Sequence, residues 1–264
     1  MSLSDAQFKR YARHLILDEF GEEGQEKLLA ARVLVVGAGG LGSPLLMYLA
    51  AAGIGTLGVV DNDNVDLTNL QRQIVHSTAN IGMAKVKSAI ESLAAINPEI
   101  RVTPHALRLT GADAAELIGE YDLVCDGSYN FATRFLLNDA CYFGRRPLVA
   151  ASLLRFEGQL STFKAYDGKT ACYRCLFREP PPPDLIPRCE EAGILGSVAG
   201  VLGTLQATET IKEILGLGRS LAGRLLIYDA LEGTTRTINV PRDPTCPLCG
   251  TSPILHDLSG HRTA

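Results

Sequence analysis

Residues 32–53 read RVLVVGAGGLGSPLLMYLAAAG, a run of β-formers, a glycine-rich turn and an apolar helix-forming run. Ser43 is expected to cap the helix, with Pro44 at its first position, because a hydroxyl accepts from early helical N–H groups and proline lacks one. A strand, a glycine turn and a helix in this order open many nucleotide-binding α/β sheets. The stretch therefore predicts the first unit of a doubly wound, Rossmann-like fold.

Gly37, Gly39 and Gly42 form the pattern G-x-G-x-x-G at the strand-to-helix junction. Glycines let the backbone approach phosphate oxygens, and the helix N-terminus supplies N–H donors. Asp61 ends the next apolar run, where an acid can accept a hydrogen bond from a ribose hydroxyl. We predict nucleotide binding, with a plain tight turn as the alternative. The motif alone does not separate NAD from ATP.

The chain alternates strands and helices as far as about residue 156, which predicts a mostly parallel sheet with right-handed crossovers. Apolar runs predict strands at 55–61, 100–107, 122–127 and 147–152, and helices at 84–96 and 131–143. Beyond residue 157, antiparallel strands are expected at 157–166, 224–231 and 234–240 and a helix at 200–215, with a Pro-rich loop at 179–193. The expected parts of one continuous domain are a helical arm (1–31), a nucleotide-binding half (32–156), a C-terminal lobe (157–250) and a tail (251–264).

Composition excludes several classes of protein. The 264 residues are 46% apolar with a net charge of −4, and the mean hydropathy is +0.11. Such a chain is globular, and a broad nucleic-acid-binding surface is not expected, although local basic residues could still hold a nucleotide. No apolar run reaches membrane-spanning length and the start is unlike a signal peptide, so the expected location is cytoplasmic.

A polar segment follows Asp61 and reads NDNVDLTNLQRQIVHSTANIGMAK. Its Asn69, Arg72, Gln73 and Lys85 come just after a strand's carboxyl end, where open α/β sheets bind ligands. Phosphoryl and nucleotidyl transfer needs cations around the phosphates, and an NAD site needs fewer. The alternative interpretation is an ordinary solvated loop.

Seven cysteines are present, and four of them form two C-x-x-C pairs, Cys172/Cys175 and Cys246/Cys249. Four thiolates suit a closed, structural tetrahedral Zn²⁺ site, which would tie the end of the chain back to the lobe. Two redox pairs are the alternative, but the thioredoxin-like context is missing. Cys125 and Cys141 are expected in the core.

These stretches together resemble the MoeB/ThiF/HesA group, bacterial relatives of ubiquitin-activating enzymes. The resemblance runs from the N-terminal arm to about residue 250. Seven motifs carry it, in the family's order: RYARHL (10–15), GAGGLGSP (37–44), DNDNVDLTNLQRQ (61–73), GMAKV (82–86), CYRC (172–175), CEEAG (189–193) and CPLC (246–249).

The resemblance implies that ATP and Mg²⁺ bind at the glycine turn. The C-terminal Gly-Gly carboxylate of a small ubiquitin-like sulfur-carrier protein would attack the α-phosphate, release pyrophosphate and leave an acyl adenylate. Positioning and electrostatics would supply most of the catalysis. The sequence does not say whether the carrier serves molybdopterin, thiamine or another pathway, and the sulfur donor is expected to be a separate protein.

Matched motif by motif, the family assigns Asp61 to the ribose and Asn69, Arg72 and Lys85 to the phosphates. Arg13 matches an arginine that reaches the triphosphate of a partner subunit, which implies a homodimer; a plain surface arginine is the alternative. The expected catalytic set is Arg13, Arg72, Lys85, Asp126 and Cys189. The other expected nucleotide-binding residues are Gly37, Gly39, Gly40, Gly42, Asp63, Gln73, Tyr129 and Asn130.

One position departs from the family's Asp-x-x-Asp-Asn pattern, because Tyr129 replaces the second acid. A phenol is a poor ligand for a hard cation such as Mg²⁺. Asp126, three residues earlier, would substitute only if its carboxylate pointed the same way. Three interpretations stay open: an active enzyme with altered metal binding, an impaired natural or engineered variant, or a carrier-binding protein that does not adenylate.

Cys189 lies in the Pro-rich loop, outside both cysteine pairs. A thiolate beside an activated acyl group could capture it covalently, and in relatives the matching cysteine either does so or has no essential role. The alternative enzyme class is an NAD-dependent oxidoreductase, which only the glycine turn and Asp61 favour.

Overall fold

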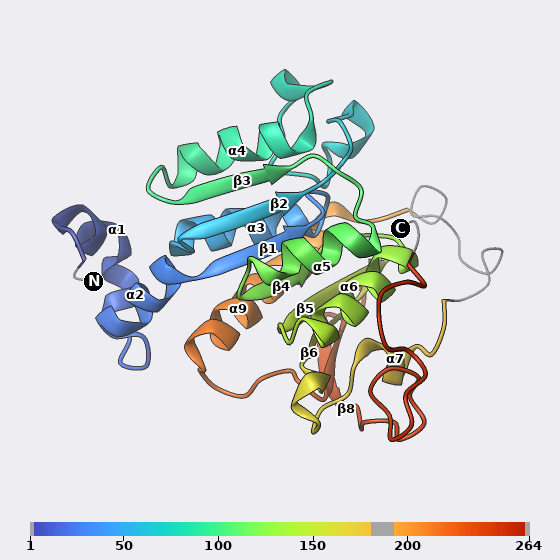
Figure 1. Ribbon diagram of the computed structural model, residues 1–264. Helices are drawn as coiled ribbons and strands as arrows, with labels where there is room; N and C mark the ends of the chain where they lie inside the picture. The colour runs from blue at the N-terminus through green and yellow to red at the C-terminus, as the bar shows by residue number, and fades with distance from the viewer. Residues whose placement is uncertain (1–2, 181–192, 262–264) are drawn as a thin grey trace.

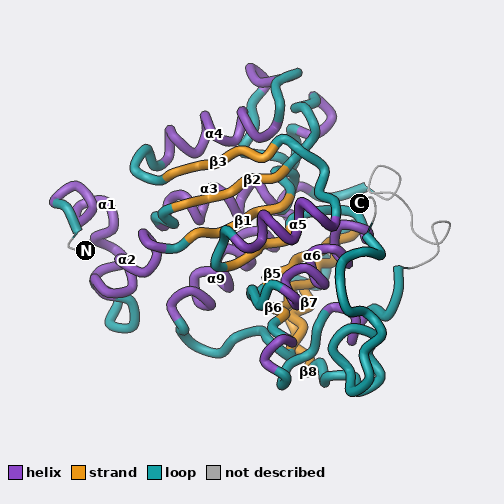
Figure 2. Tube along the Cα trace, viewed as in Figure 1, coloured by secondary structure: helices purple, strands orange, loops and turns teal. Residues whose placement is uncertain are grey.

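The computed structural model describes residues 3–180 and 193–261, and it builds both halves of the chain on one sheet (Figures 1 and 2). The strand order is β3-β2-β1-β4-β5-β6-β7-β8. The first five strands are parallel, and the last three pair antiparallel. The strands are β1 Arg32–Val36, β2 Thr56–Val60, β3 Arg101–His105, β4 Leu123–Asp126, β5 Leu148–Leu154, β6 Glu157–Phe163, β7 Arg224–Asp229 and β8 Thr234–Asn239.

Helices cover both faces of the parallel part of the sheet. They are α1 Asp5–Leu15, α2 Gly21–Ala30, α3 Gly42–Ala52, α4 Lys85–Ile96, α5 Gly111–Gly119, α6 Phe131–Phe143, α7 Tyr173–Leu176 and α9 Gly196–Leu215, with short 3₁₀ turns at Leu67–Asn69, Thr78–Asn80 and Ala165–Asp167. Within the described ranges, no helix is long and apolar enough to cross a bilayer.

Alternation along the strands divides the core into two layers. Val33 and Val35 of β1 pack with α3, α4 and α9, whereas Leu34 and Val36 pack with α5 and α6. Successive side chains of a strand point to opposite faces, so a strand covered on both sides is apolar throughout. Burying each such side chain contributes roughly 1.5–3 kcal/mol. The loops that follow these strands therefore lie between the two helical layers, at the carboxyl ends of the strands.

The predicted doubly wound fold with an antiparallel extension is confirmed, with two local corrections. Helix α3 begins at Gly42 with Leu41 as N-cap, so the prediction that Ser43 caps it was wrong. Ser43 lies inside the first turn, and its Oγ donates to the Gly39 carbonyl at 2.7 Å. Helix α5 was not anticipated; Thr110 and Asp113 start it with a reciprocal capping box.

The N-terminal arm is two helices, and α1 lies at the end of the sheet opposite the glycine turn (Figure 1). Tyr11 of α1 packs against Gly53, which caps the C-terminus of α3. Its hydroxyl accepts a 2.9 Å hydrogen bond from Asn97, which caps α4. Helices of a parallel α/β sheet run against the strands, so their C-termini mark the strands' starting end. Helix α1 is therefore fixed far from its own chain's strand ends.

Candidate functional site

The turns after β1 and β4 meet backbone to backbone, and only glycine fits there. Gly37 has φ of +99°, and a Cβ on it would lie 2.8 Å from the Gly127 carbonyl oxygen. A Cβ on Gly42 would lie 1.8 Å from the oxygen of Gly37. Any side chain here would push the turn away from the start of α3. The predicted phosphate-binding turn is therefore a tight backbone cradle at the carboxyl ends of β1 and β4.

Ala38, inside the glycine turn, is held from both sides. Its N–H donates to Asp61 Oδ2 at 2.8 Å, and its carbonyl lies 2.9 Å from His76 Nε2. His76 Nδ1 in turn lies 2.8 Å from the Ser88 hydroxyl of α4. Burial lowers the pKa of His76, so the ring is neutral and its Nε2–H donates to Ala38. Sequence reasoning gave His76 no role, because no sequence pattern reports a side chain bonded to a distant carbonyl.

Asn69, Arg72 and Gln73 form a hydrogen-bonded group on top of the glycine turn. Asn69 Oδ1 accepts from Arg72 Nη2 at 3.2 Å and from Gln73 Nε2 at 2.9 Å. A Cβ on Gly39 would lie 3.7 Å from Gln73 Nε2, and one on Gly40 would lie 3.6 Å from Arg72 Cγ. The polar segment and the glycine turn are therefore in contact. The Arg72 guanidinium is oriented by the neutral Asn69 amide, which does not compensate its charge.

Lys85 approaches the same end of the sheet from the start of α4. Its Nζ lies 2.9 Å from Asp63 Oδ2, with the lysine side chain only 6% exposed and the aspartate 48%. A buried ammonium paired with a half-exposed carboxylate is held in one position. The structure therefore brings Gly37, Gly39, Gly40, Gly42, Asp61, Asp63, Asn69, Arg72, Gln73 and Lys85 to one edge of the sheet.

Helix α9 contacts the glycine turn and the polar segment and holds the end of β4, from which the next loop starts. A Cβ on Gly203 would meet the Leu41 carbonyl, and a Cβ on Gly196 would meet that of Gln71. Gln206 donates to the carbonyls of Asp126, the last residue of β4, and of Val149, near the start of β5, both at 2.9 Å. One helix therefore sets the relative position of the glycine turn, the polar segment and the β4 loop.

The carboxylate of Asp126 faces the interior and is fully used there. The residue is 1% exposed, and its Oδ1 accepts from the Ser128 N–H and hydroxyl at 2.8 and 2.6 Å. Arg134 of α6 lies 3.8 Å from Oδ2 and donates to the carbonyls of Ser128 and Ala151. Asp126 and Arg134 thus brace the loop. The structure does not bring the Asp126 carboxylate to the open site.

The other two residues of this loop have different surroundings. Tyr129 is 75% exposed. Asn130 caps α6, its Oδ1 accepting from the Thr133 N–H at 2.8 Å, which leaves only its amide N–H₂ for a ligand. Two other expected catalytic residues are not with the group: exposed Arg13 lies on α1 at the far end of the sheet, and Cys189 lies outside the described residues.

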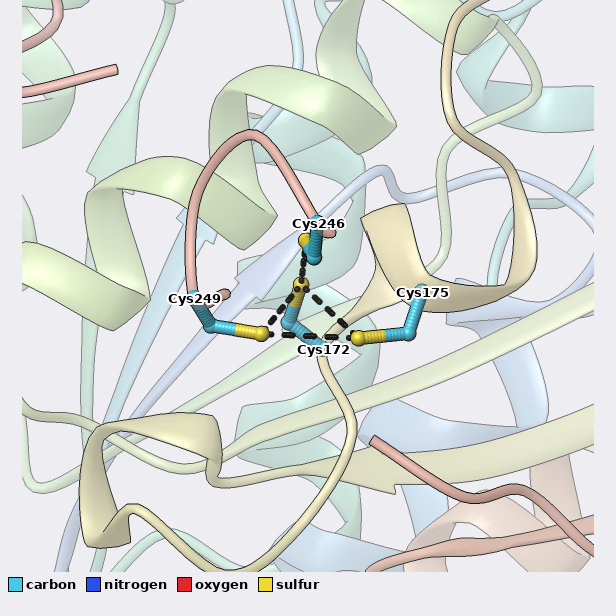
Figure 3. A group of neighbouring side chains, drawn as sticks. All are labelled: Cys172, Cys175, Cys246 and Cys249. Atoms are coloured by element: carbon cyan, nitrogen blue, oxygen red, sulfur yellow. Dashed lines mark hydrogen bonds between the residues drawn. The ribbon is translucent and has the colours of Figure 1, made fainter. Parts of the chain in front are cut away.

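The two cysteine pairs form one compact cluster (Figure 3). Cys172 precedes α7 and Cys175 lies within it, with their sulfurs 3.9 Å apart. The Cys172 sulfur lies 3.6 Å from that of Cys246 and 3.5 Å from that of Cys249, and the Cys175 sulfur lies 3.4 Å from that of Cys249. A regular tetrahedron of thiolates around Zn²⁺ with Zn–S of 2.3 Å has sulfurs about 3.8 Å apart. Contact with Cys175 and the other two thiols raises the pKa of Cys172 well above its usual range. Without a cation the four therefore cannot all ionise.

The sequence profile of the ThiF family matches residues 11–248. The chain belongs to the ThiF family. The match contains every residue of the sheet-edge group and three of the four clustered cysteines, with Cys249 one position beyond it.

Several curated ThiF-family relatives are similar over nearly the whole chain. A sulfur carrier protein adenylyltransferase from Thermus thermophilus is 46% identical, over 98% of this chain and 96% of that protein. A probable adenylyltransferase/sulfurtransferase MoeZ from Mycobacterium tuberculosis is 52% identical over 93% of this chain, and the chain spans 63% of its length. The Bos taurus adenylyltransferase and sulfurtransferase MOCS3 is 49% identical, with 57% of its length covered.

Solved structures of the microcin C7 biosynthetic enzyme MccB share the ThiF-family fold. The complex with N-formylated MccA has a TM-score of 0.81 and 25% identity, over 91% of this chain and 75% of that one. The Escherichia coli MccB complex with AMPCPP and MccA has a TM-score of 0.79 at 25% identity, with 91% and 74% covered. The similarity extends across both the parallel and the antiparallel parts of the sheet.

Proposed function

We propose that this protein adenylates the C-terminal glycine carboxylate of a ubiquitin-like sulfur-carrier protein with ATP, for molybdopterin, thiamine or related sulfur transfer. The observation that supports it most is the contact of the glycine turn with Asn69, Arg72 and Gln73, with Lys85 alongside. Two cations around a phosphate-sized backbone cradle suit a triphosphate better than a nicotinamide dinucleotide. The names of the Thermus, Mycobacterium and bovine relatives, and MccB bound to AMPCPP and MccA, support the same reaction.

In the proposed reaction a carboxylate oxygen of the carrier bonds to the α-phosphorus of ATP while the bond from that phosphorus to the β-phosphate oxygen breaks. Pyrophosphate leaves with the electron pair, and no proton moves because a terminal carboxylate is ionised at neutral pH. Gly39 to Gly42 would bind the phosphates through N–H groups, because the N–H groups of Gly37 and Ala38 already donate to Val60 and Asp61. Asp61 would accept from the ribose. Arg72 and Lys85 would stabilise the charge that develops on the leaving group.

Magnesium, when bound, would neutralise phosphate charge, but the protein offers it few ligands here. Asp126 is buried and bonded to Ser128, Asp63 is paired with Lys85, and Tyr129 carries a phenol. Hard cations prefer carboxylate oxygens. The loop after β4 therefore does not fit a protein-held magnesium.

A homodimer would complete the site. Arg13 cannot reach the glycine turn of its own chain, because α1 is fixed at the opposite end of the sheet. Ile16 and Leu17, just after Arg13, are exposed, as are Leu67, Ile74 and Ile81 of the polar segment. Exposed apolar residues gathered on two such segments are typical of an interface. We propose that α1 of one subunit packs on the polar segment of its partner, bringing Arg13 to the triphosphate in trans.

The cysteine cluster is proposed to hold zinc. Four sulfurs within 4.8 Å of one another leave no open position for substrate, so the role is structural. Zinc would make all four thiols thiolates and so stabilise the cluster. The predicted structural role, joining the end of the chain to the lobe, follows from the separation of the two pairs.

One observation favours a second candidate, a carrier-binding protein without adenylation. The exposed Tyr129 stands where the family has an acid, and the buried Asp126 does not replace it. ATP–pyrophosphate exchange measured with a panel of Gly-Gly-terminated carriers separates the two. Carrier-dependent exchange is expected. Carrier binding with no exchange at any magnesium concentration would establish the second candidate instead, and uptake of a dinucleotide with no ATP binding would overturn both.

A further inference from the structure

The carboxyl ends of the parallel strands, where the glycine turn and the polar segment meet, are called the nucleotide edge. A cavity of about 520 Å³ lies at the opposite end of the sheet. Its lining comes from residues 169–170, from the 219–224 segment that leads into β7, and from residues 239–242 at and after the end of β8. Strand β6 runs antiparallel to β5, so its end at Phe163 lies beside the start of β5, and the start of β7 lies at that same end. The cavity is therefore separate from the glycine turn, which lies where the parallel strands finish.

Four cationic side chains from three segments line this cavity: Lys169, Arg219, Arg224 and Arg242. Among the described residues, no acidic side chain belongs to its lining. Thr170, Ser220 and Asn239 add hydroxyl and amide groups. Four cations together are unusual in a chain whose net charge is −4. Like charges repel, so such a cluster is stabilised by an anion.

Neutral carbonyl groups orient the two inner arginines. Arg224 donates from Nε and Nη2 to the Ser220 carbonyl, at 3.1 and 2.6 Å, and from Nη2 to the Arg219 carbonyl at 2.9 Å. Arg242 donates to the carbonyls of Gly168, at 3.0 Å, and Cys249. Carbonyls fix the guanidinium planes without neutralising them, so unused N–H groups and the full charge remain for a ligand.

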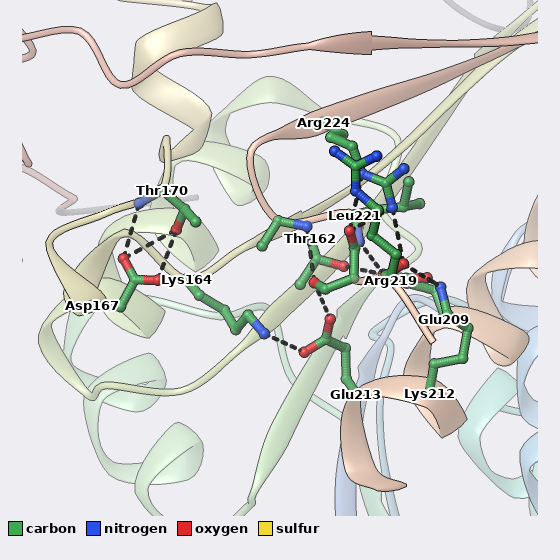
Figure 4. Close-up of polar contacts among 12 residues, drawn as sticks. Thr162, Lys164, Asp167, Thr170, Glu209, Lys212, Glu213, Arg219, Leu221 and Arg224 are labelled. Atoms are coloured by element: carbon green, nitrogen blue, oxygen red, sulfur yellow. Dashed lines mark hydrogen bonds and ion pairs between the residues drawn. The ribbon is translucent and has the colours of Figure 1, made fainter. Parts of the chain in front are cut away.

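The two nearest glutamates form ion pairs with lysines outside the cavity lining (Figure 4). Glu209 pairs with Lys212 and accepts from the Leu221 N–H, and Glu213 pairs with Lys164 at 2.6 Å. Asp167 Oδ1 accepts from the N–H groups of Lys169 and Thr170 at 2.7 and 2.9 Å. The side chains of Lys169 and Arg219 make no ion pair with any described acid. The cationic lining is thus in excess.

We propose that this cavity binds a multivalent oxyanion of the phosphate class, such as pyrophosphate or a phosphate ester. Guanidinium forks match the oxygens of phosphate in a bidentate way, and exposed Lys169 and Arg219 close around the anion as mobile arms. The cavity is wide enough for more than a single phosphate group. The site does not depend on the adenylation proposal, because it shares no residue with the nucleotide edge.

The test is calorimetric titration of inorganic pyrophosphate into the full-length protein at low ionic strength. The Lys169→Gln/Arg219→Gln double variant changes only exposed side chains and should bind at least about tenfold more weakly, or about 1.4 kcal/mol. Arg236→Gln, a change of one exposed cation on β8 outside the cavity, is the matched control. Arg72→Gln removes a cation from the nucleotide edge, so binding that persists in it belongs to the remote cavity.

The outcomes are distinct. Binding lost in the double variant and kept in Arg72→Gln and Arg236→Gln supports the site. Equal binding in the double variant and the unchanged protein, or no pyrophosphate binding beyond that lost in Arg72→Gln, overturns it. Binding of a polyglutamate peptide but not pyrophosphate also overturns it, because the surface would then recognise an acidic protein segment. ATP–pyrophosphate exchange in the double variant should be unchanged, so failure here would leave the adenylation proposal intact.

Discussion

Tyr129→Asp is the substitution that best tests the chemistry of the sheet edge. Asp126 cannot supply a carboxylate there, because it is 1% exposed and bonded to Ser128 and Arg134. Tyr129 lies in the loop after β4, which contacts the glycine turn, and it is 75% exposed. A carboxylate at this position can therefore turn toward a bound metal without a change in the fold. The substitution should therefore restore a hard-cation ligand and raise ATP–pyrophosphate exchange.

The size of the effect follows from exposure. Hydrogen bonds to charged groups contribute about 1.5–3 kcal/mol, and a solvated position takes the lower end of that range. About 1.5 kcal/mol corresponds to roughly a tenfold increase in the exchange rate. The magnesium concentration that gives half-maximal exchange should fall in parallel, because the new ligand acts on the metal.

Exchange would be measured over a magnesium titration for the unchanged protein, Tyr129→Asp and Tyr129→Asn. The asparagine variant removes the ring without adding charge, so it should stay near the unchanged rate. Equal rates in all three proteins would refute the reasoning, since an acid would then have no role here. An equal rise in both variants would instead assign the effect to the bulk of the tyrosine ring.

Three further predictions concern the cysteine cluster, the dimer and His76. Elemental analysis should find about one zinc per chain, and Cys246→Ser or strong chelation should lower the melting temperature, with Cys141→Ser as a control that keeps the metal. Arg13→Ala and Arg72→Ala should each be inactive alone, yet subunits exchanged between them should recover about a quarter of the activity, because each mixed dimer has one intact site; no recovery would place Arg13 outside the site. Burial lowers the pKa of His76 below 6.5 in the folded chain. The unfolded chain therefore binds a proton at a higher pH than the folded chain does, so the free energy of unfolding should fall as the pH drops below about 6.5. His76→Gln should show a smaller fall in denaturant midpoint between about pH 7.5 and 5.5 than the unchanged protein, and an identical pH profile would contradict the assignment.

The elements with strong local signals could be predicted from the sequence. Continuous apolar runs gave β1, β2, β4 and β5, and the glycine turn gave the junction with α3. Helix α6 was expected at 131–143, the range that the structure has. Helix α5 was missed because its sequence, GADAAELIG, has two glycines and a short apolar face, and its stability depends on the capping box and on packing against α6.

Side-chain orientation could not be predicted. The sequence places Asp126 at the end of a strand, yet cannot show that its carboxylate turns inward to Ser128 and Arg134. His76 looked unremarkable because its partners, Ala38 and Ser88, come from two other elements. The cationic cavity was also missed, since its four cations, one lysine and three arginines, come from three separate segments and only the antiparallel pairing of β6, β7 and β8 brings them together.

Helix α9 contacts the glycine turn through Gly203, the polar segment through Gly196, and strands β4 and β5 through Gln206. A helix with so many buried partners cannot open by a local fluctuation, because its release would disrupt the glycine turn, the polar segment and strands β4 and β5 at once. Its amide protons should exchange with solvent only when the whole domain unfolds. A nucleotide at the edge would then slow hydrogen exchange across the entire molecule, far beyond the loops that it touches.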